Sequence, residues 1–186
     1  LIVATSCSKY IKLERSGTVE EKYTAAMQYY QEKDFYKCTS LLENIMPFIN
    51  GKEEFEDAVF VFAESYFYQN EYILSAHYYN RFISKFPRNE KRPLAEYMIA
   101  KSLYMQSPKV SLDQTETEHA LNSLQTYLNK YPHTEYTEEC NNLIIELHQK
   151  LIDKAYHTAK LHLQIKNYKA AVASFDSFSK TFPDSQ

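Results

Sequence analysis

The sequence predicts an all-α protein, a right-handed superhelical solenoid of stacked helical hairpins, and three observations support this. The 186 residues include only two glycines, Gly17 and Gly51. A spacing of small and large apolar residues recurs ahead of three prolines, and the segment 138–165 contains neither proline nor glycine. Because tight turns between strands need glycine at positive φ, so few glycines favour long helices joined by short polar turns.

The composition allows a packed core and excludes several functional classes. Hydrophobic residues make up 44% of the chain and charged residues 24%, both close to the average of globular domains. Two isolated glycines cannot form a glycine-rich phosphate loop or the elbow that carries a nucleophilic serine. The net charge is −3, and lysine and arginine are spread along the chain, so we expect no nucleic-acid partner.

The N-terminal residues suggest a processed leader. The apolar start is too short to cross a bilayer, which takes about 20 apolar residues. Ala4-Thr5-Ser6-Cys7 resembles a bacterial lipobox, and this resemblance implies cleavage before Cys7, lipidation of its thiol and a membrane anchor made of acyl chains. Residues 1–18 are then a signal remnant and linker. A free cysteine in a disordered tail is the alternative.

The repeat is clearest in the segments that end at Pro87, Pro132 and Pro183. A small residue lies twelve positions before each proline, a large apolar residue eight before and an aromatic residue five before. These residues are Ser75, Tyr79 and Phe82; Ala120, Leu124 and Tyr127; and Ala171, Phe175 and Phe178. The spacing is that of tetratricopeptide (TPR) hairpins. Small residues let helix A and helix B of a hairpin cross closely, large residues fill the seam, and proline ends helix B.

Four copies follow from this spacing, at 19–52, 56–89, 93–135 and 138–185. The first copy lacks the proline but keeps five residues in register: Ala26, Tyr29, Cys38, Leu42 and Ile45. A polar residue followed by an aromatic residue closes the hairpin turn at Asp34-Phe35, Glu71-Tyr72 and Asn167-Tyr168. Close crossing further predicts that Ala63, Ala100 and Ala159 are buried.

The last two copies depart from the basic unit. A polar insertion at 106–113 predicts an exposed loop between the helices of the third copy. About 14 extra residues precede the core of the fourth copy at 152–185, which is close to four turns of helix, and 138–165 is expected to form one long helix. Since a solenoid usually ends in a polar capping helix, we expect a further repeat beyond residue 186.

The sequence shows no constellation that favours catalysis or metal binding. Cys38 and Cys140 lie about a hundred residues apart, and His157 and His162 are five apart, a spacing that does not place two ligands on one helix face. We therefore expect no metal, no cofactor and no enzyme. An unrecognised catalytic site in the groove described next remains the alternative, and it would require polar groups that converge in a pocket.

One stripe of each helix A is expected to line the concave surface of the solenoid. The stripe contains Tyr23, Met27 and Tyr30 in the first copy, Phe60, Glu64 and Phe67 in the second, and Tyr97, Lys101 and Tyr104 in the third. Rigid aromatic rings beside polar groups suit the capture of an extended peptide, so these nine residues form the candidate peptide-binding groove. Packing between adjacent repeats through the same residues is the alternative.

Nearly the whole chain resembles the BamD family of outer-membrane assembly lipoproteins. The resemblance rests on the lipobox-like start, the second-repeat segment Asn80–Pro87, the loop-bearing third repeat with Tyr131–Tyr136, and the long helix that leads to Lys166–Val172 and Thr181–Ser185. It implies a lipid-anchored scaffold on the periplasmic face of the outer membrane.

The same resemblance implies particular partners. C-terminal repeats of the family contact the core subunit of the barrel-assembly machinery, which also contains other assembly lipoproteins. N-terminal repeats recognise segments of unfolded outer-membrane proteins, often near their C-termini. Another lipidated TPR adaptor, such as a pilotin-like or cell-wall coordination factor, is the alternative, and co-purifying proteins would distinguish the two.

Overall fold

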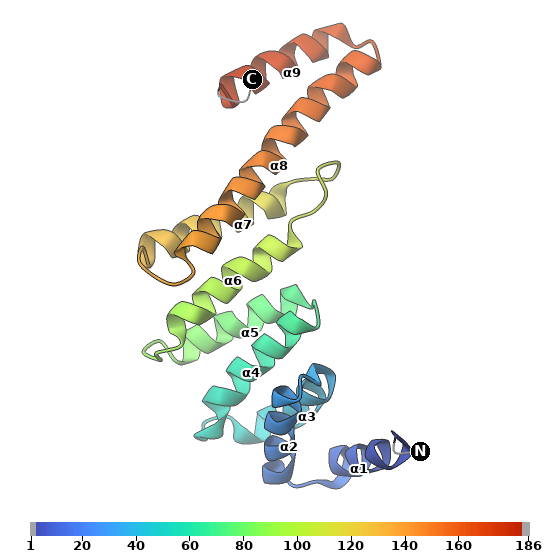
Figure 1. Ribbon diagram of the computed structural model, residues 1–186, viewed down its shortest axis with the longest axis vertical. Coiled ribbons are helices and arrows are strands. Elements are labelled where there is room, and N and C mark those ends of the chain that lie inside the picture. The colour runs from blue at the N-terminus through green and yellow to red at the C-terminus, as the bar shows by residue number, and fades with distance from the viewer. Residues whose placement is uncertain (1–2, 184–186) are drawn as a thin grey trace. The chain divides into compact units, whose positions relative to one another are not determined.

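The computed structural model describes the backbone of residues 3–183 and the side chains from Lys9 onward, and every regular element in this range is a helix (Figure 1). The helices are α1 (Val3–Ser16), α2 (Val19–Gln31), α3 (Phe35–Ile49), α4 (Glu54–Tyr68), α5 (Tyr72–Lys85), α6 (Arg92–Gln106), α7 (Thr115–Lys130), α8 (Thr137–Gln164) and α9 (Tyr168–Thr181). The predicted all-α, TPR-like class is therefore confirmed.

The chain divides into two compact units, Leu1–Ser102 and Leu103–Gln186, and the division falls within α6. In the N-terminal unit, α2 packs on α3 and α4 packs on α5, and α3 also contacts α4. In the C-terminal unit, α8 contacts both α7 and α9. None of the described helices is both long enough and apolar enough to cross a membrane.

The small residues are buried, as the spacing predicts. Ala63, Ala100 and Ala159 have no exposed surface, and the same is true of Cys38 and Ser75. Helices also end where the prolines require it: α5, α7 and α9 end two residues before Pro87, Pro132 and Pro183. The segment between Thr137 and Gln164 forms one continuous helix of 28 residues.

Two of the small residues, Cys38 and Ser75, have a role in addition to the expected one. Cys38 of α3 accepts a hydrogen bond from Ser65 of α4 (3.4 Å), and Ser102 of α6 donates to Ser75 of α5 (3.3 Å). Both pairs are 27 residues apart. These small residues therefore let helix B approach helix A of the next repeat, and not only the partner helix within its own hairpin.

Three hairpin turns contain a left-handed residue that is not glycine. Lys33, Asn70 and Lys166 have φ of 61°, 63° and 60°. At the second of these turns, Glu71 N donates to the Tyr66 carbonyl (2.9 Å), and Asn70 N donates to the Phe67 carbonyl (3.0 Å). This bonding closes helix A with a Schellman-type motif and fixes the sharp reversal into helix B.

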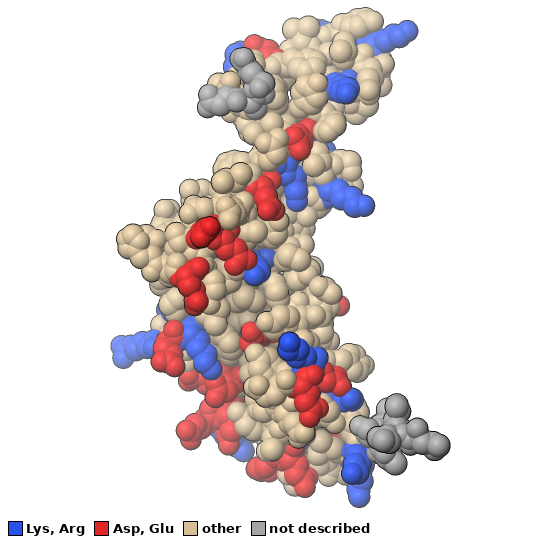
Figure 2. Space-filling model, viewed as in Figure 1, with Lys and Arg blue, Asp and Glu red and all other residues tan. Residues whose placement is uncertain are grey.

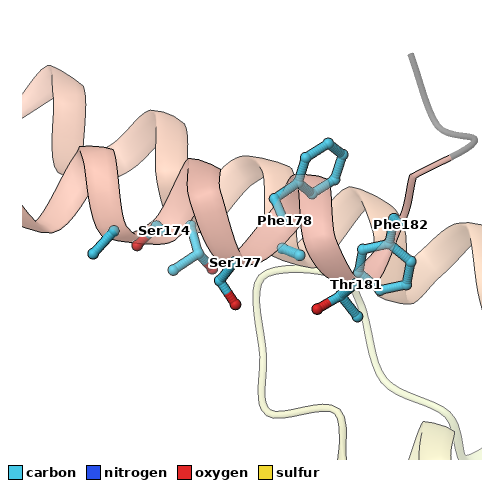
Figure 3. Close-up of a pocket in the computed structure, with 8 residues that line it drawn as sticks. Ser174, Ser177, Phe178, Thr181 and Phe182 are labelled. Carbon is cyan, nitrogen blue, oxygen red and sulfur yellow. The ribbon is translucent and has the colours of Figure 1, made fainter.

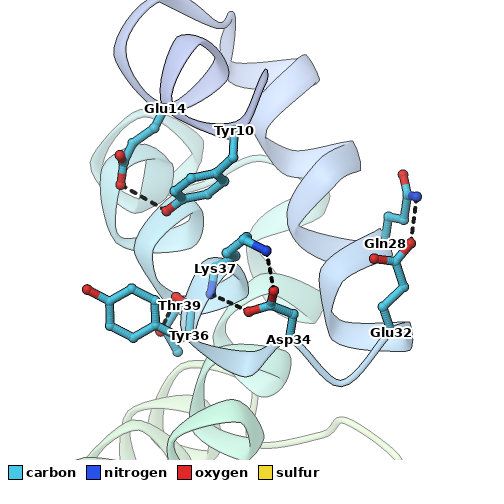
Figure 4. Close-up of polar contacts among 8 residues, drawn as sticks. All are labelled: Tyr10, Glu14, Gln28, Glu32, Asp34, Tyr36, Lys37 and Thr39. Carbon is cyan, nitrogen blue, oxygen red and sulfur yellow. Dashed lines mark hydrogen bonds and ion pairs between the residues drawn. The ribbon is translucent and has the colours of Figure 1, made fainter. Parts of the chain in front are cut away.

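Residues 3–16 form helix α1, where a linker was expected, and α1 contacts α2 and α3. Tyr10 donates to Glu14 of the same helix (2.9 Å; Figure 4), and Ser40 of α3 donates to the same carboxylate (2.5 Å). The ring of Tyr10 meets the ring of Tyr29 edge to face at 5.9 Å. The bonds from Ser40 and Tyr10 lower the pKa of Glu14. Side-chain contacts thus hold α1 against the first hairpin.

The predicted loop between α6 and α7 is present at residues 107–114, and one buried side chain organises it. Gln114 is 7% exposed and donates its amide to the carbonyls of Lys109 and Leu112, at 3.0 Å each. Thr117 of α7 donates to the Gln114 side-chain oxygen (2.7 Å). The loop is therefore pinned from within, while Leu112 at its tip is exposed.

Candidate peptide-binding surface

The candidate groove residues of the first repeat lie on α2 and are partly exposed. Tyr23 and Tyr30 stand two turns apart, with Met27 between them. Burial, followed by the charges of Asp57 and Glu54, raises the pKa of Tyr23, so its phenol faces the acidic start of α4. Tyr30 donates to Glu64 of α4 at 2.5 Å, which joins the stripes of the first and second repeats.

The stripe on α4 is only partly available to a ligand. Phe60 is 6% exposed because its ring packs edge-on against Tyr79 and Phe82, at 5.5 and 5.2 Å. Glu64 and Phe67 are half-buried. A ligand in this groove would therefore meet Glu64 and Phe67 directly, whereas Phe60 supports them from the core.

The stripe on α6 shows the same division within the N-terminal unit. Tyr97 is 2% exposed and belongs to the core. Lys101 is half-buried, and its ammonium lies 5.4 Å from the centre of the Tyr97 ring and 6.0 Å from that of Phe67. These distances permit cation–π attraction, so Lys101 connects the stripe of the third repeat to that of the second.

Tyr104 completes the predicted set but belongs to the C-terminal unit. Its hydroxyl donates to Glu146 of α8, and this bond raises the pKa of Tyr104 to about 12. The structure therefore brings together partly exposed residues of the N-terminal unit: Tyr23, Met27, Tyr30, Glu64, Phe67 and Lys101.

Two aromatic residues outside the prediction extend this surface. Phe35 and Tyr68 stack with ring centres 4.7 Å apart, and Phe35 also meets Tyr30 edge to face at 6.1 Å. With Gln31 and Lys33 they line a pocket of about 320 Å³. From the sequence, Phe35 was expected only to close the hairpin turn. Tyr68, one residue after the predicted stripe, gave no periodic signal.

A buried hydroxyl lies behind the groove. Tyr79 has no exposed surface, and its hydroxyl has no hydrogen-bond partner among the described residues. Burial, followed by the charge of Glu64, raises its pKa well above the ordinary value. Tyr79 therefore stays neutral, and its ring supports Phe60 from the core.

The described side chains, from residue 9 to 183, include no group of three histidine, cysteine or acidic residues able to hold a metal ion. On the face shown in Figure 2, lysine and arginine side chains are scattered among acidic ones and do not gather in one patch. Cys38 and Cys140 are buried, and burial raises the pKa of the Cys38 thiol to about 11. The side chain of Cys7, the predicted lipidation site, lies outside the described side chains.

Comparison with known proteins assigns the chain to a family. The family model described as "Outer membrane lipoprotein" (YfiO) matches residues 15–186. The outer membrane protein assembly factor BamD of Caulobacter vibrioides is 31% identical over 96 residues, which cover 52% of this chain and 32% of that protein. The BamD of Rickettsia prowazekii is 29% identical over 126 residues, which cover 68% of this chain and 50% of that protein. The chain thus spans about a third to a half of these relatives, and it belongs to the YfiO family of outer membrane lipoproteins.

Proposed function

We propose that this protein is a lipid-anchored scaffold of the machinery that assembles β-barrel proteins in the outer membrane. The family description and the names of both relatives support this role. The anchor is the lipidated thiol of Cys7, and the helical repeats face the periplasm. Several acyl chains on one cysteine hold a protein firmly, since each buried CH₂ contributes about 0.8 kcal/mol.

The groove of the N-terminal unit captures extended segments of unfolded barrel proteins. The observation that carries this proposal is the row of partly exposed aromatic side chains on α2 and α4, which includes the acidic Glu64 of α4 and ends at the basic Lys101 of α6. Tyr23, Tyr30 and Phe67 offer rigid apolar area, while Glu64 and Lys101 offer charges. A barrel strand alternates apolar and polar side chains, so its apolar residues fit between the rings.

The C-terminal unit contacts the core barrel-assembly subunit and other assembly lipoproteins. The α8–α9 turn and the start of α9 expose large apolar side chains: Ile165 is 62% exposed, Tyr168 62% and Val172 70%. Apolar residues that cluster on a surface are characteristic of protein interfaces. Contact with a partner would remove this apolar area from water.

The groove is tested by truncating only its accessible rings. Tyr23→Ser with Phe67→Ser should weaken binding of a fluorescent peptide ending in the last strand of an outer-membrane barrel by at least about tenfold, since each lost aromatic contact is worth roughly 1 kcal/mol or more. Fluorescence polarisation gives the affinity, and circular dichroism checks the helical content. Phe60 and Tyr97 are left intact because their loss would damage the core.

Tyr36→Ser is the matched control, because Tyr36 is an aromatic residue that is 73% exposed on α3 outside the groove. This variant should bind the peptide like the wild type. Equal affinity of the groove variant and the control would exclude the groove.

The anchor is tested separately: Cys7→Ala should move the full-length protein from the membrane fraction to the soluble periplasmic fraction, and unchanged fractionation would refute lipidation at Cys7.

A further inference from the structure

A hollow of about 410 Å³ lies between α8 and α9 of the C-terminal unit. Ala155 and Thr158 line it from α8, and Ala173, Ser174, Ser177 and Phe178 line it from α9. Figure 3 shows Ser174, Ser177 and Thr181 following one another along α9. Except for two phenylalanine rings, the lining side chains are small, so space is left that the described part of this unit does not fill.

In the second repeat, the space equivalent to this hollow is filled by two aromatic rings. The left-handed residues Asn70 and Lys166 mark the same point of the hairpin turn and lie 96 residues apart. With this offset, Thr158 and Ser174 correspond to Phe62 and Tyr78. Those two rings meet edge to face with centres 4.6 Å apart. The hollow therefore exists because two aromatic rings of the second repeat are replaced by hydroxyl side chains in the fourth.

The first repeat shows that a helix can cover this face. Its left-handed residue, Lys33, lies 133 residues before Lys166, so Ser40 corresponds to Ala173. Ser40 donates to Glu14 of α1, and Tyr10 of α1 packs against Tyr29. Helix α1 thus docks on the first hairpin at the position equivalent to Ala173, and it uses a tyrosine and an acidic residue four positions later. Its other contact, Tyr29, corresponds to His162, the neighbour of Leu161 on α8.

A second hollow of about 430 Å³ lies beside the first, and Thr158 lines both. This second hollow lies between α8 and the loop at 107–114, with Val110 on the loop and the 54% exposed Leu161 on α8. The two hollows together form a trough that extends from α9 across α8 to the loop. A single side chain cannot fill a trough of this extent, whereas one face of a helix can.

The charge of the trough restricts its occupant. Lys154 and His157 line the second hollow, and no acidic side chain lines either hollow. Lys154 donates to the Ser111 carbonyl at 3.1 Å, so its ammonium lies at the edge of the trough beside the loop. An acidic group on the occupant would be attracted there, while a basic group would be repelled.

We propose that this trough docks an amphipathic helix of a partner protein that carries a tyrosine or phenylalanine and, near it, an acidic residue. The aromatic ring fills the space between Thr158 and Ser174. The acidic residue faces Lys154 and His157. This site lies in the C-terminal unit and does not depend on the peptide groove of the N-terminal unit.

The probe is a synthetic peptide based on α1, residues 3–16, because α1 docks on the first hairpin at the position equivalent to Ala173. It carries serine at position 7 and glutamine in place of Lys9, Lys12 and Arg15, so that Tyr10 and Glu14 are kept and no basic side chain opposes Lys154. It is titrated into the full chain while NMR follows the methyl groups of Ala155 and Ala173. We expect both signals to shift. A Tyr10→Ala peptide should bind at least about fivefold more weakly, since it lacks the ring.

The decisive variant fills the hollow as the second repeat does. Thr158→Phe with Ser174→Tyr restores the ring pair and should weaken peptide binding at least tenfold, with helical content and Tm at least as high as in the wild type. If this variant fails to fold, Ser177→Arg serves instead, since Ser177 is exposed and arginine stands at the equivalent Arg81.

Three results would overturn the proposal. The first is a titration in which Ala155 and Ala173 do not shift, or shift equally in the filled variant. The second is a set of shifts confined to the residues that contact α1 in the first hairpin, Tyr29 and Ser40, which would mean that the peptide only exchanges with the chain's own α1. The third is a concentration-dependent dimer in sedimentation that the filled variant abolishes, which would assign the trough to a second copy of this chain.

Discussion

The second and fourth repeats share one spacing of small and large residues, but the second buries far more of these residues than the fourth. Helix α5 buries Ser75, Ala76, Tyr79 and Phe82, whereas α9, with the same small and large positions, buries only Ala171. Helix α4 buries seven residues in 15, and α8 buries three in 28. The repeat pattern therefore specifies a hairpin, whereas the burial of its residues depends on the helices that pack against that hairpin.

The sharpest test of this difference is a matched pair of core truncations. Phe82 is fully buried, and its equivalent in the fourth repeat, Phe178, is half-buried. Phe82→Ala should cost about 3–5 kcal/mol of unfolding free energy. Phe178→Ala should cost roughly 1–2 kcal/mol, since much of its ring already faces water. Urea denaturation followed by circular dichroism measures both, and equal losses would show that the α8–α9 hairpin is as well packed as α4–α5.

Thiol labelling compares the two units without changing their cores. Burial raises the pKa of Cys38 from 9.0 to about 11, so at pH 8 its thiolate fraction falls about 100-fold below that of an exposed thiol. Cys140 is equally buried but lies in the C-terminal unit, which we expect to open more often.

In a Cys7→Ser background, an aromatic disulfide reagent should therefore label Cys140 before Cys38, with mass spectrometry locating the label. The raised pKa of Cys38 also makes the stability of the fold depend on pH. Its neutral thiol stabilises the fold below pH 9, and this contribution is lost as the pH rises from 9 towards 11. Labelling of Cys38 first would reverse the order of stability of the two units.

The smallest effect concerns the left-handed turns. Lys166→Gly should stabilise the fourth hairpin by about 0.5–1 kcal/mol. Glycine removes a backbone cost of about 1–2 kcal/mol in the left-handed conformation, and the higher entropy that it gives the unfolded chain offsets part of this gain. Asn70→Gly should change stability by less, since asparagine tolerates this conformation well. Thermal unfolding measures both changes. A lower Tm for Lys166→Gly would mean that the lysine side chain itself stabilises the turn.

Much of the fold was predictable because the signals are local. Prolines, small residues and the missing glycines gave the helix ends, the burial of Ala63, Ala100 and Ala159, and the long helix α8. The positions of the three hairpin turns were predicted, but their left-handed residues were not, because these are lysine or asparagine and not the glycine that marks such a conformation. The helix at residues 3–16 was not predicted, because the contacts that support it come from α2 and α3.

The candidate groove was predictable as a stripe but not as a surface. Helical spacing selects Phe60 and Tyr97 together with Tyr23, Glu64 and Phe67, yet only the packed structure shows that the first two lie in the core. A helix stripe is wider than the part that faces a ligand, and side chains of α5 decide where the core begins. The groove itself remains a prediction.

Because α8 is one continuous helix, the number of residues in it determines the direction in which α9 leaves it. Each residue of an α-helix advances the chain by 1.5 Å along the helix axis and rotates it by 100° about that axis. Deleting one residue between Cys140 and Ala159 would therefore swing α9 to another side of α8, whereas deleting seven would return it to within about 20° of its former direction, roughly 10 Å nearer to α7. Lineages that shorten or lengthen this rod should accordingly do so in steps of about seven residues.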